Sequence, residues 1–205
     1  MVIWRSLFFY MFDNTLSTRG EGETFGFTKT VNTVESGDII SVAELKQWGR
    51  IDYDDDDALL QTLIDGAIDM TERYLYQTLK QKTYTFEYQG YGVEIPLPYG
   101  PHVSVDEVRR KQQGDEEVLS TDDYFVTGQD FKTLNMYQSF SYQQLEVDVT
   151  AGYGLANIPS QIKIAMLKVA LSHYEDRQDI LSGTIVAELP DSSRNILNKY
   201  KRYVI

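Results

Sequence analysis

Cysteine is absent from this chain of 205 residues, and only two histidines are present. The lack of cysteine excludes a disulfide framework, a thiolate zinc site and a cysteine nucleophile. His102 and His173 are far apart in the sequence, so we expect them in different elements, where they supply little for metal or triad chemistry. The motifs of phosphate loops, serine hydrolases and zinc proteases are also missing. We therefore predict no catalytic residue, no metal site and no cofactor.

A dinucleotide fingerprint and a membrane span are absent too. Gly152 and Gly154 follow a predicted strand, but Asn157 stands where the third glycine of the fingerprint belongs. The apolar stretch at residues 7–12 is too short to cross a bilayer. It has neither a basic start nor a small-residue cleavage site, so we expect no signal peptide and no membrane partner. These absences favour a protein of the cytoplasm or of a particle assembled there.

Positive charge is scarce, since 19 lysines and arginines face 31 aspartates and glutamates and leave a net charge of −12. Non-specific affinity for nucleic acid comes from lysine and arginine that replace phosphate counterions, so the chain is not built to grip DNA. An acidic wall repels a polyanion and lets it slide past. The charge therefore remains compatible with a conduit for DNA.

The strongest positive signal is a strand, a glycine turn and an apolar helix over residues 145–177. The strand alternates apolar and acidic residues, and Pro159 suits the first helical turn. The helix predicted at residues 159–177 is apolar over most of its circumference, so it should pack on several sides. Its central stripe consists of Ile162, Ala165, Met166, Val169 and Ala170. We expect it to be the core helix of the fold.

Three further helices are predicted. Ser41 and Glu44 have the spacing of a capping box at the start of a helix over residues 41–48. Apolar residues keep helical spacing over residues 57–79. Asp191 is placed to cap a last helix within residues 191–205.

Aspartates cluster just ahead of the helix at residues 57–79. Asp52, Asp54 and Asp56 imitate the first ligand positions of a calcium-binding EF-hand loop, but Asp57 replaces the required glycine and Leu63 the closing glutamate. We favour carboxylates that cap the helix and complement its positive end. A calcium-regulated protein is the alternative, and its melting temperature would rise with calcium.

The middle of the chain, residues 83–150, is rich in predicted strands. Residues 83–88 and 93–97 flank a glycine-containing turn and indicate a hairpin, and Gln113 and Gly114 turn residues 103–110 back on the chain. Short connections make the strands antiparallel. Strands are also predicted at residues 117–119, 124–127, 131–136 and 143–150.

Aromatic residues concentrate in these strands: Tyr84, Phe86, Tyr88, Tyr91, Tyr99 and Tyr124. A stacking platform for single-stranded nucleic acid would need interleaved basic residues, which are mostly missing, whereas strands favour aromatics in any case. A small acidic hydrolase or carbohydrate-binding module that uses the tyrosine-rich strands is the alternative function. It predicts a concave site with two carboxylates at catalytic separation.

The sequence therefore predicts an α+β fold, in which helices from both ends of the chain form a small bundle and an antiparallel β-rich insertion lies between them. We divide the chain into an extended arm at 1–38, a core domain at 39–190 and a C-terminal helix or tail at 191–205. The arm is either a mobile terminus or a strap that lays aromatic side chains on a neighbouring subunit. Those side chains are Trp4, Phe8, Phe9 and Phe12.

Residues 39–203 resemble the head-to-tail connector (adaptor) proteins of long-tailed bacteriophages. The specific pieces are the aspartate-rich start of the second helix, the AGYG turn at 151–154 with Ile158-Pro159, and the Leu189-Pro190 pair. The resemblance implies a protein without catalysis, assembled in the bacterial cytoplasm and carried in the neck of the virion. About a dozen copies would form a ring, because head-to-tail contacts close when the rotation fits.

The same resemblance implies the partners. The portal protein would lie above the ring, a stopper or tail-completion (tail terminator) protein below it, and DNA would pass through without sequence-specific binding. The C-terminal helix, with an apolar face beside a basic one, would bind the portal. The residues that we predict to make this contact are Arg194, Ile196, Leu197, Lys199, Tyr200, Lys201, Arg202, Tyr203 and Val204. Deleting residues 194–205 is expected to leave the fold intact and abolish attachment.

Overall fold

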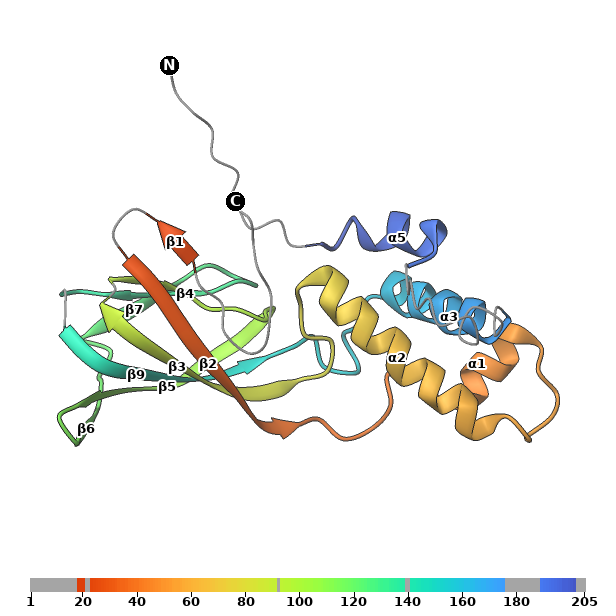
Figure 1. The fold of residues 1–205 in the computed structure, drawn as a ribbon, viewed down its shortest axis with the longest axis horizontal. Helices are drawn as coiled ribbons and strands as arrows, with labels where there is room; N and C mark the ends of the chain where they lie inside the picture. Colours follow the sequence, from red (N-terminus) through yellow and green to blue (C-terminus); the bar gives the residue numbers. More distant parts are fainter. Residues whose placement is uncertain (1–17, 21–22, 92, 139–140, 176–188, 202–205) are drawn as a thin grey trace, which may run out of the picture. The chain divides into compact units, whose positions relative to one another are not determined.

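The computed structural model describes residues 18–20, 23–91, 93–138, 141–175 and 189–201. The chain divides into two compact units, a β unit of Met1–Val34 and Lys82–Ala151 and a helical unit of Glu35–Gln81 and Gly152–Ile205 (Figure 1). The α+β class predicted from the sequence is confirmed.

Two antiparallel sheets build the β unit. The larger sheet has the strand order β1-β2-β3-β9-β5-β6, and the smaller sheet has the order β4-β8-β7. The strands of the larger sheet are β1 (Thr18–Gly20), β2 (Glu23–Val34), β3 (Lys82–Tyr91), β9 (Ser141–Ala151), β5 (His102–Gln112) and β6 (Asp115–Val118). Those of the smaller sheet are β4 (Glu94–Pro96), β8 (Thr133–Met136) and β7 (Tyr124–Thr127).

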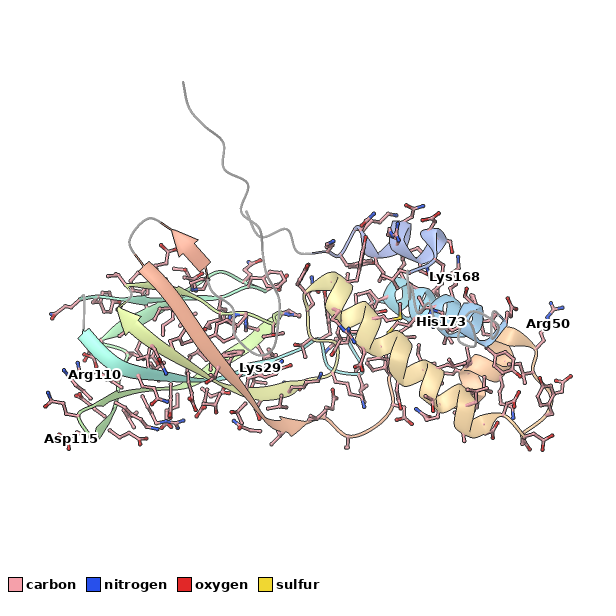
Figure 2. All side chains as sticks on the ribbon, viewed as in Figure 1. Lys29, Arg50, Arg110, Asp115, Lys168 and His173 are labelled. Carbon is pink, nitrogen blue, oxygen red and sulfur yellow. The ribbon has the colours of Figure 1, made fainter. Side chains whose placement is uncertain are left out.

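One predicted hairpin is present and the other is wrong. Gln113 and Gly114 both have positive φ, 54° and 94°, and join β5 to β6 in a two-residue turn, which places the exposed Asp115 just after it (Figure 2). By contrast, β3 pairs with β2 and β9, and β4 pairs with β8 in the other sheet. Alternation of apolar residues shows which face of a strand is buried, but it does not identify the neighbouring strand.

Aromatic side chains of β3 form the core of the β unit rather than a surface. Tyr84, Phe86 and Tyr88 are at most 3% exposed. The Phe86 ring stacks on Tyr84, with ring centres 5.5 Å apart, and on Tyr99, with centres 6.2 Å apart. A stacking platform for nucleic acid on these three side chains is therefore excluded.

Part of the predicted N-terminal arm belongs to the sheet. Strand β2 pairs with β3 from Gly26 to Val34, and the Phe27 ring packs edge-on against Phe86 with ring centres 5.8 Å apart. The stretch is rich in threonine, valine and phenylalanine, which suit a half-buried strand. The expectation of an arm over residues 1–38 was thus wrong for residues 23–34, because this strand pairs with residues that lie 48 positions or more further along the chain.

Four described helices form the second unit: α1 (Val42–Gly49), α2 (Asp57–Leu75), α3 (Ser160–Glu175) and α5 (Asp191–Leu197). They share an aliphatic core. The predicted stripe on α3 is confirmed, since its five members are at most 1% exposed. The capping box of Ser41 and Glu44 is also present. No helix among the described residues is both long and apolar enough to cross a bilayer.

Helix α2 ends four residues before the predicted boundary at residue 79. Tyr76 adopts a left-handed conformation with φ of 55°, which stops the helix. The Glu72 side chain then accepts a hydrogen bond from the Leu79 amide at 2.8 Å, and Leu79 is fully buried. The apolar spacing therefore continues past the helix, because the following turn also enters the core.

The turn before α3 requires glycine at position 152 for a steric reason. Gly152 has φ of 116°, and a Cβ atom there would lie 2.1 Å from the carbonyl oxygen of Lys80. Only glycine fits this position. Nearby, the Glu35 carboxylate accepts hydrogen bonds from the Gln81 amide at 3.2 Å and the Leu155 amide at 3.0 Å, so three segments of the helical unit are tied together.

Candidate functional site

The predicted partner-binding helix, α5, packs on the core of its own unit. Leu197 is fully buried, and the buried Ser193 hydroxyl donates a hydrogen bond to the carbonyl oxygen of Ala165 on α3 at 3.2 Å. Pro190 occupies the N-cap position, and Asp191 is the first helical residue rather than the cap. The assignment of Leu197 to a portal contact is therefore wrong, because the side chain is not accessible to a partner.

Residues 198–201 are held against the C-terminal end of α2. The Gln77 side-chain amide donates to the Tyr200 carbonyl oxygen at 2.6 Å, and the Tyr74 hydroxyl donates to Asn198. The Lys201 ammonium lies 4.4 Å from the centre of the Tyr74 ring, a cation–π distance. A truncation from Arg194 would remove Leu197 from the core, so we expect it to destabilise the helical unit rather than leave the fold intact.

The remaining members of the predicted contact stay predictions. Lys199 is exposed, and Arg194, Ile196, Tyr200 and Lys201 are half-buried. Together they leave a basic surface at the end of the described chain. The other predicted contact residues, Arg202, Tyr203 and Val204, and the arm residues Trp4, Phe8, Phe9 and Phe12 lie outside the described residues.

A pocket of about 290 Å³ opens between α2 and the start of α5, lined by Met70, Arg73, Tyr74, Leu189 and Arg194. Its volume is near the lower end of the range for ligand pockets, about 300–1,000 Å³. One Arg194 nitrogen donates to the Leu189 carbonyl oxygen at 3.4 Å, and another lies 3.5 Å from the carboxylate of the exposed Asp191. Arg73 is exposed and makes no side-chain ion pair with any described residue. We term this feature the arginine pocket.

Sequence reasoning missed Arg73 and Met70. Their spacing with Tyr74, at i, i+3 and i+4, puts the three side chains on one helix face, which is a readable signal. That Arg194 joins them follows only from the packing of α5 on α2 and α3.

The loop before α2 is held by internal bonds to a single lysine. Lys46 on α1 binds the Asp54 carboxylate and that of Asp57, the latter at 2.8 Å. The hydrogen bond from Lys46 holds the pKa of Asp54 below its ordinary value. Asp57 lies in the first turn of α2, where a negative charge complements the helix dipole, as predicted.

A tyrosine pair fixes the centre of the same loop. The Tyr174 hydroxyl donates to the Asp56 carboxylate at 2.6 Å and lies 2.6 Å from the Tyr53 hydroxyl. The hydrogen bond to Asp56, followed by that to Tyr53, raises the pKa of Tyr174. Asp56 occupies the N-cap position of α2, but its side chain makes no capping bond, so capping by this carboxylate was wrong.

Two aspartates of this loop have side chains that are exposed to solvent. Asp52 and Asp55 are exposed and make no hydrogen bond or ion pair through their side chains with another described residue. Tyr53, which lies between them, is 50% exposed. No group of three or more histidine or acidic side chains within the described part of the chain is arranged to hold a metal ion. We term residues 52–55 the acidic knob.

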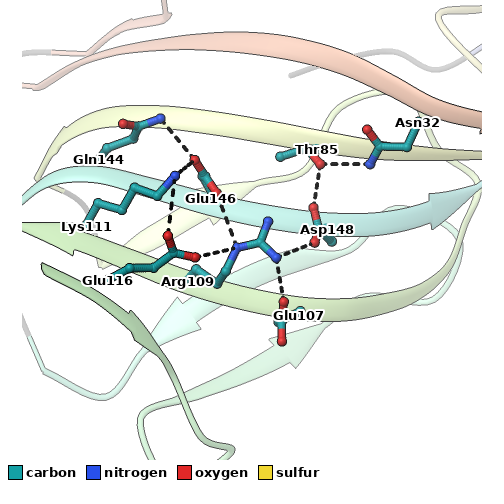
Figure 3. A network of polar contacts seen from close by, with 9 residues as sticks. All are labelled: Asn32, Thr85, Glu107, Arg109, Lys111, Glu116, Gln144, Glu146 and Asp148. Carbon is teal, nitrogen blue, oxygen red and sulfur yellow. Dashed lines mark hydrogen bonds and ion pairs between the residues drawn. The ribbon is translucent and has the colours of Figure 1, made fainter. Parts of the chain in front are cut away.

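The outer face of the larger sheet carries a network of charged and polar side chains (Figure 3). Glu146 on β9 is only 7% exposed and accepts hydrogen bonds from Arg109, at 3.2 Å, and from Lys111. Burial by itself raises the pKa of Glu146, but the two cations outweigh burial and hold the pKa below its ordinary value. Asp148 binds Arg109 at 2.9 Å and accepts a bond from Thr85. Both cations of this network are therefore paired with carboxylates of their own unit.

The described residues form an α+β fold with exposed charged side chains at both ends of α2. Residues 38–203 match the head completion protein family. The chain belongs to this family and is a structural virion protein rather than an enzyme. The hydrolase alternative is therefore wrong. Tyr84 and Tyr88 are buried in the core of the β unit, so they are not accessible to a carbohydrate.

Solved structures with the same fold come from phage-like particles. A chain in the neck of an empty gene transfer agent particle, computed with C6 symmetry, is 19% identical with a TM-score of 0.69, and the match covers 87% of this chain and 97% of that one. A chain in the virion of a native gene transfer agent particle is 19% identical with a TM-score of 0.68, and the match covers 86% of this chain and 96% of that one. A chain in the neck of the native particle, computed with C12 symmetry, is 18% identical with a TM-score of 0.63, and the match covers 86% of this chain and 97% of that one. A comparison with curated proteins finds no match.

Proposed function

We propose that this protein is an adaptor in the neck of a phage or phage-like particle, where copies form a ring below the portal. The match to the head completion family over residues 38–203 carries this proposal. The ring would extend the DNA channel and offer a docking platform to the next neck or tail protein. Similar chains in neck structures with six-fold and twelve-fold symmetry support a ring of about a dozen copies.

Charge supports passage of DNA without capture. The chain carries a net charge of −12, and the basic side chains of the sheet network are paired with carboxylates. Phosphate affinity needs unpaired lysine and arginine, so DNA would move past such a surface rather than bind to it.

The basic surface around Lys199 and Lys201 is the proposed portal contact. Both residues follow the buried Leu197, so they can bind a partner without unfolding α5. Trp4, Phe8, Phe9 and Phe12 are the proposed contacts of the N-terminal arm with a neighbouring subunit. A stopper or tail-completion protein would bind the opposite side of the ring.

The testing experiment is electron microscopy of the protein mixed with a cognate portal, alongside light scattering of the protein alone. We expect an added ring on the portal. Lys199→Glu should reduce attachment while leaving the melting temperature near that of the wild type, because Lys199 is exposed. A protein that stays monomeric and ignores the portal would contradict the proposed function.

A further inference from the structure

We propose that the arginine pocket receives the acidic knob of a second copy of this chain, and that this is a head-to-tail contact of the ring. The inference rests on the proposed function and names one interface within it. It follows from the chemistry of the two features and from their positions at opposite ends of α2.

The pocket offers positive charge on an apolar wall. Arg73 and Arg194 bring two guanidinium groups to a cavity whose other lining residues are Met70, Tyr74 and Leu189. Arg73 makes no side-chain ion pair with any described residue, whereas Arg194 donates to the Leu189 carbonyl oxygen and pairs with Asp191. An arriving carboxylate can therefore form with Arg73 the planar, two-bond contact that guanidinium groups favour.

The knob has the complementary composition. Tyr53 supplies a half-exposed aromatic ring, and Asp52 and Asp55 supply carboxylates on either side of it. Tyrosine and arginine are the residue types that most often dominate the energy of an interface. The ring suits the apolar wall and can also lie against a guanidinium group.

The loop is ordered before any partner arrives. Lys46 holds Asp54 and Asp57, and Tyr174 holds Asp56 and Tyr53. These bonds reduce the conformational entropy that binding would otherwise cost. Among residues 52–57, Asp52 and Asp55 remain exposed without a hydrogen bond or ion pair to another described residue.

One chain cannot bring the two features together. Between Asp57, next to the knob, and Arg73, in the pocket, α2 rises about 24 Å at about 1.5 Å per residue. A knob at one end and a pocket at the other end of a rigid helix make a heterologous contact, which propagates from copy to copy and closes when the rotation fits. Charge complementarity supports this occupant, because the arginines of the pocket oppose the exposed Asp52 and Asp55 of the knob.

Cross-linking gives a direct test because the natural chain has no cysteine. The double variant Asp55→Cys with Met70→Cys places one thiol in the knob and one in the pocket, while Arg73, Arg194 and Tyr53 remain. A thiol cross-linker much shorter than the length of α2 cannot join them within one chain. We expect a ladder of linked chains that ends at the ring size, in concentrated protein or on a cognate portal.

Asp115→Cys with Met70→Cys is the matched control, because Asp115 is also an exposed aspartate but lies in the β unit. We expect no ladder from it. A portal-bound ring of the knob–pocket variant without a ladder would overturn the inference and leave the proposed function standing. Neither ring nor ladder would overturn both.

Charge exchange provides an independent measurement. Arg73→Glu alone, or Asp55→Arg alone, should weaken assembly at least about tenfold, and the double exchange should recover most of the loss. Unchanged melting temperatures would show that the single variants still fold. Assembly of both single variants at the wild-type level, or no recovery in the double variant, would count against the inference.

Discussion

The two units differ in how far their charged surface side chains are paired within the unit. On the β unit, Arg109 is surrounded by four carboxylates, those of Glu107, Glu116, Glu146 and Asp148, and the network pairs charge inside the sheet. On the helical unit, charge stays outward at both ends of α2, at Asp52 and Asp55 before it and Arg73 near its end.

This difference distinguishes charged side chains that stabilise their own unit from charged side chains that are available to bind another molecule. A carboxylate such as Glu146, nearly buried and bound by two cations, contributes to the stability of its own sheet. Exposed aspartates without a partner contribute little to folding, and they keep their full capacity to bind another molecule. We therefore expect substitutions in the β-unit network to alter stability and substitutions at the ends of α2 to alter assembly.

The largest effect on stability is expected from Phe86→Ala. Phe86 is fully buried and stacks on two aromatic rings, so the variant should lose about 3–5 kcal/mol of unfolding free energy. Hydrogen exchange read by mass spectrometry would assign the loss to β3 and β9. Val103→Ala, at a side chain that is 55% exposed, is the control. Faster exchange in α3 as well would show that the two units unfold together.

A comparable loss in the helical unit is expected from Leu197→Ala. This fully buried side chain anchors the short helix α5, and its removal should cost about 2–5 kcal/mol. Urea denaturation measures the loss, and the neighbouring exposed variant Lys199→Ala should change stability by less than about 0.5 kcal/mol. If Leu197→Ala were as stable as the wild type, Leu197 would not be needed in the core and would again be a candidate partner contact.

A smaller effect, with a dependence on pH, is expected from Glu146→Gln. The folded state lowers the pKa of Glu146, so its contribution is complete above the ordinary value of about 4.5 and is lost as the pH falls through the lower, folded value. Glu146→Gln should cost about 1–3 kcal/mol at pH 7. The difference from the wild type should shrink below pH 4.5, as followed by urea denaturation at several pH values. A difference that stays constant down to pH 3 would contradict this account.

The smallest effect is a gain in stability. The Thr71 hydroxyl on α2 is buried without a hydrogen-bond partner in the described structure. Thr71→Val keeps the shape and removes the unsatisfied group, and it should stabilise the helical unit by about 1 kcal/mol. Thermal melting measures it, with Thr62→Val as the control, since the exposed Thr62 hydroxyl donates to the Ala58 carbonyl oxygen at 3.0 Å.

Local patterns in the sequence were sufficient for several elements. The capping box of Ser41 and Glu44, the buried stripe of α3 and the two-residue turn at Gln113 and Gly114 all occur as predicted. Each depends on residues a few positions apart, whose backbone preferences or helix spacing act within one element. Other local motifs, among them the AGYG turn at 151–154 and the Leu189-Pro190 pair, indicated the resemblance to phage connector proteins, which the family match confirms.

Contacts between distant segments required the folded chain. The sheet position of β2, the separation of β3 from β4 and the burial of Leu197 depend on partners far along the chain. The arginine pocket likewise exists only because α5 brings Arg194 beside Arg73. A strand or helix shows in its own sequence which face is apolar, whereas the surface that covers this face is selected by packing among all the elements at once.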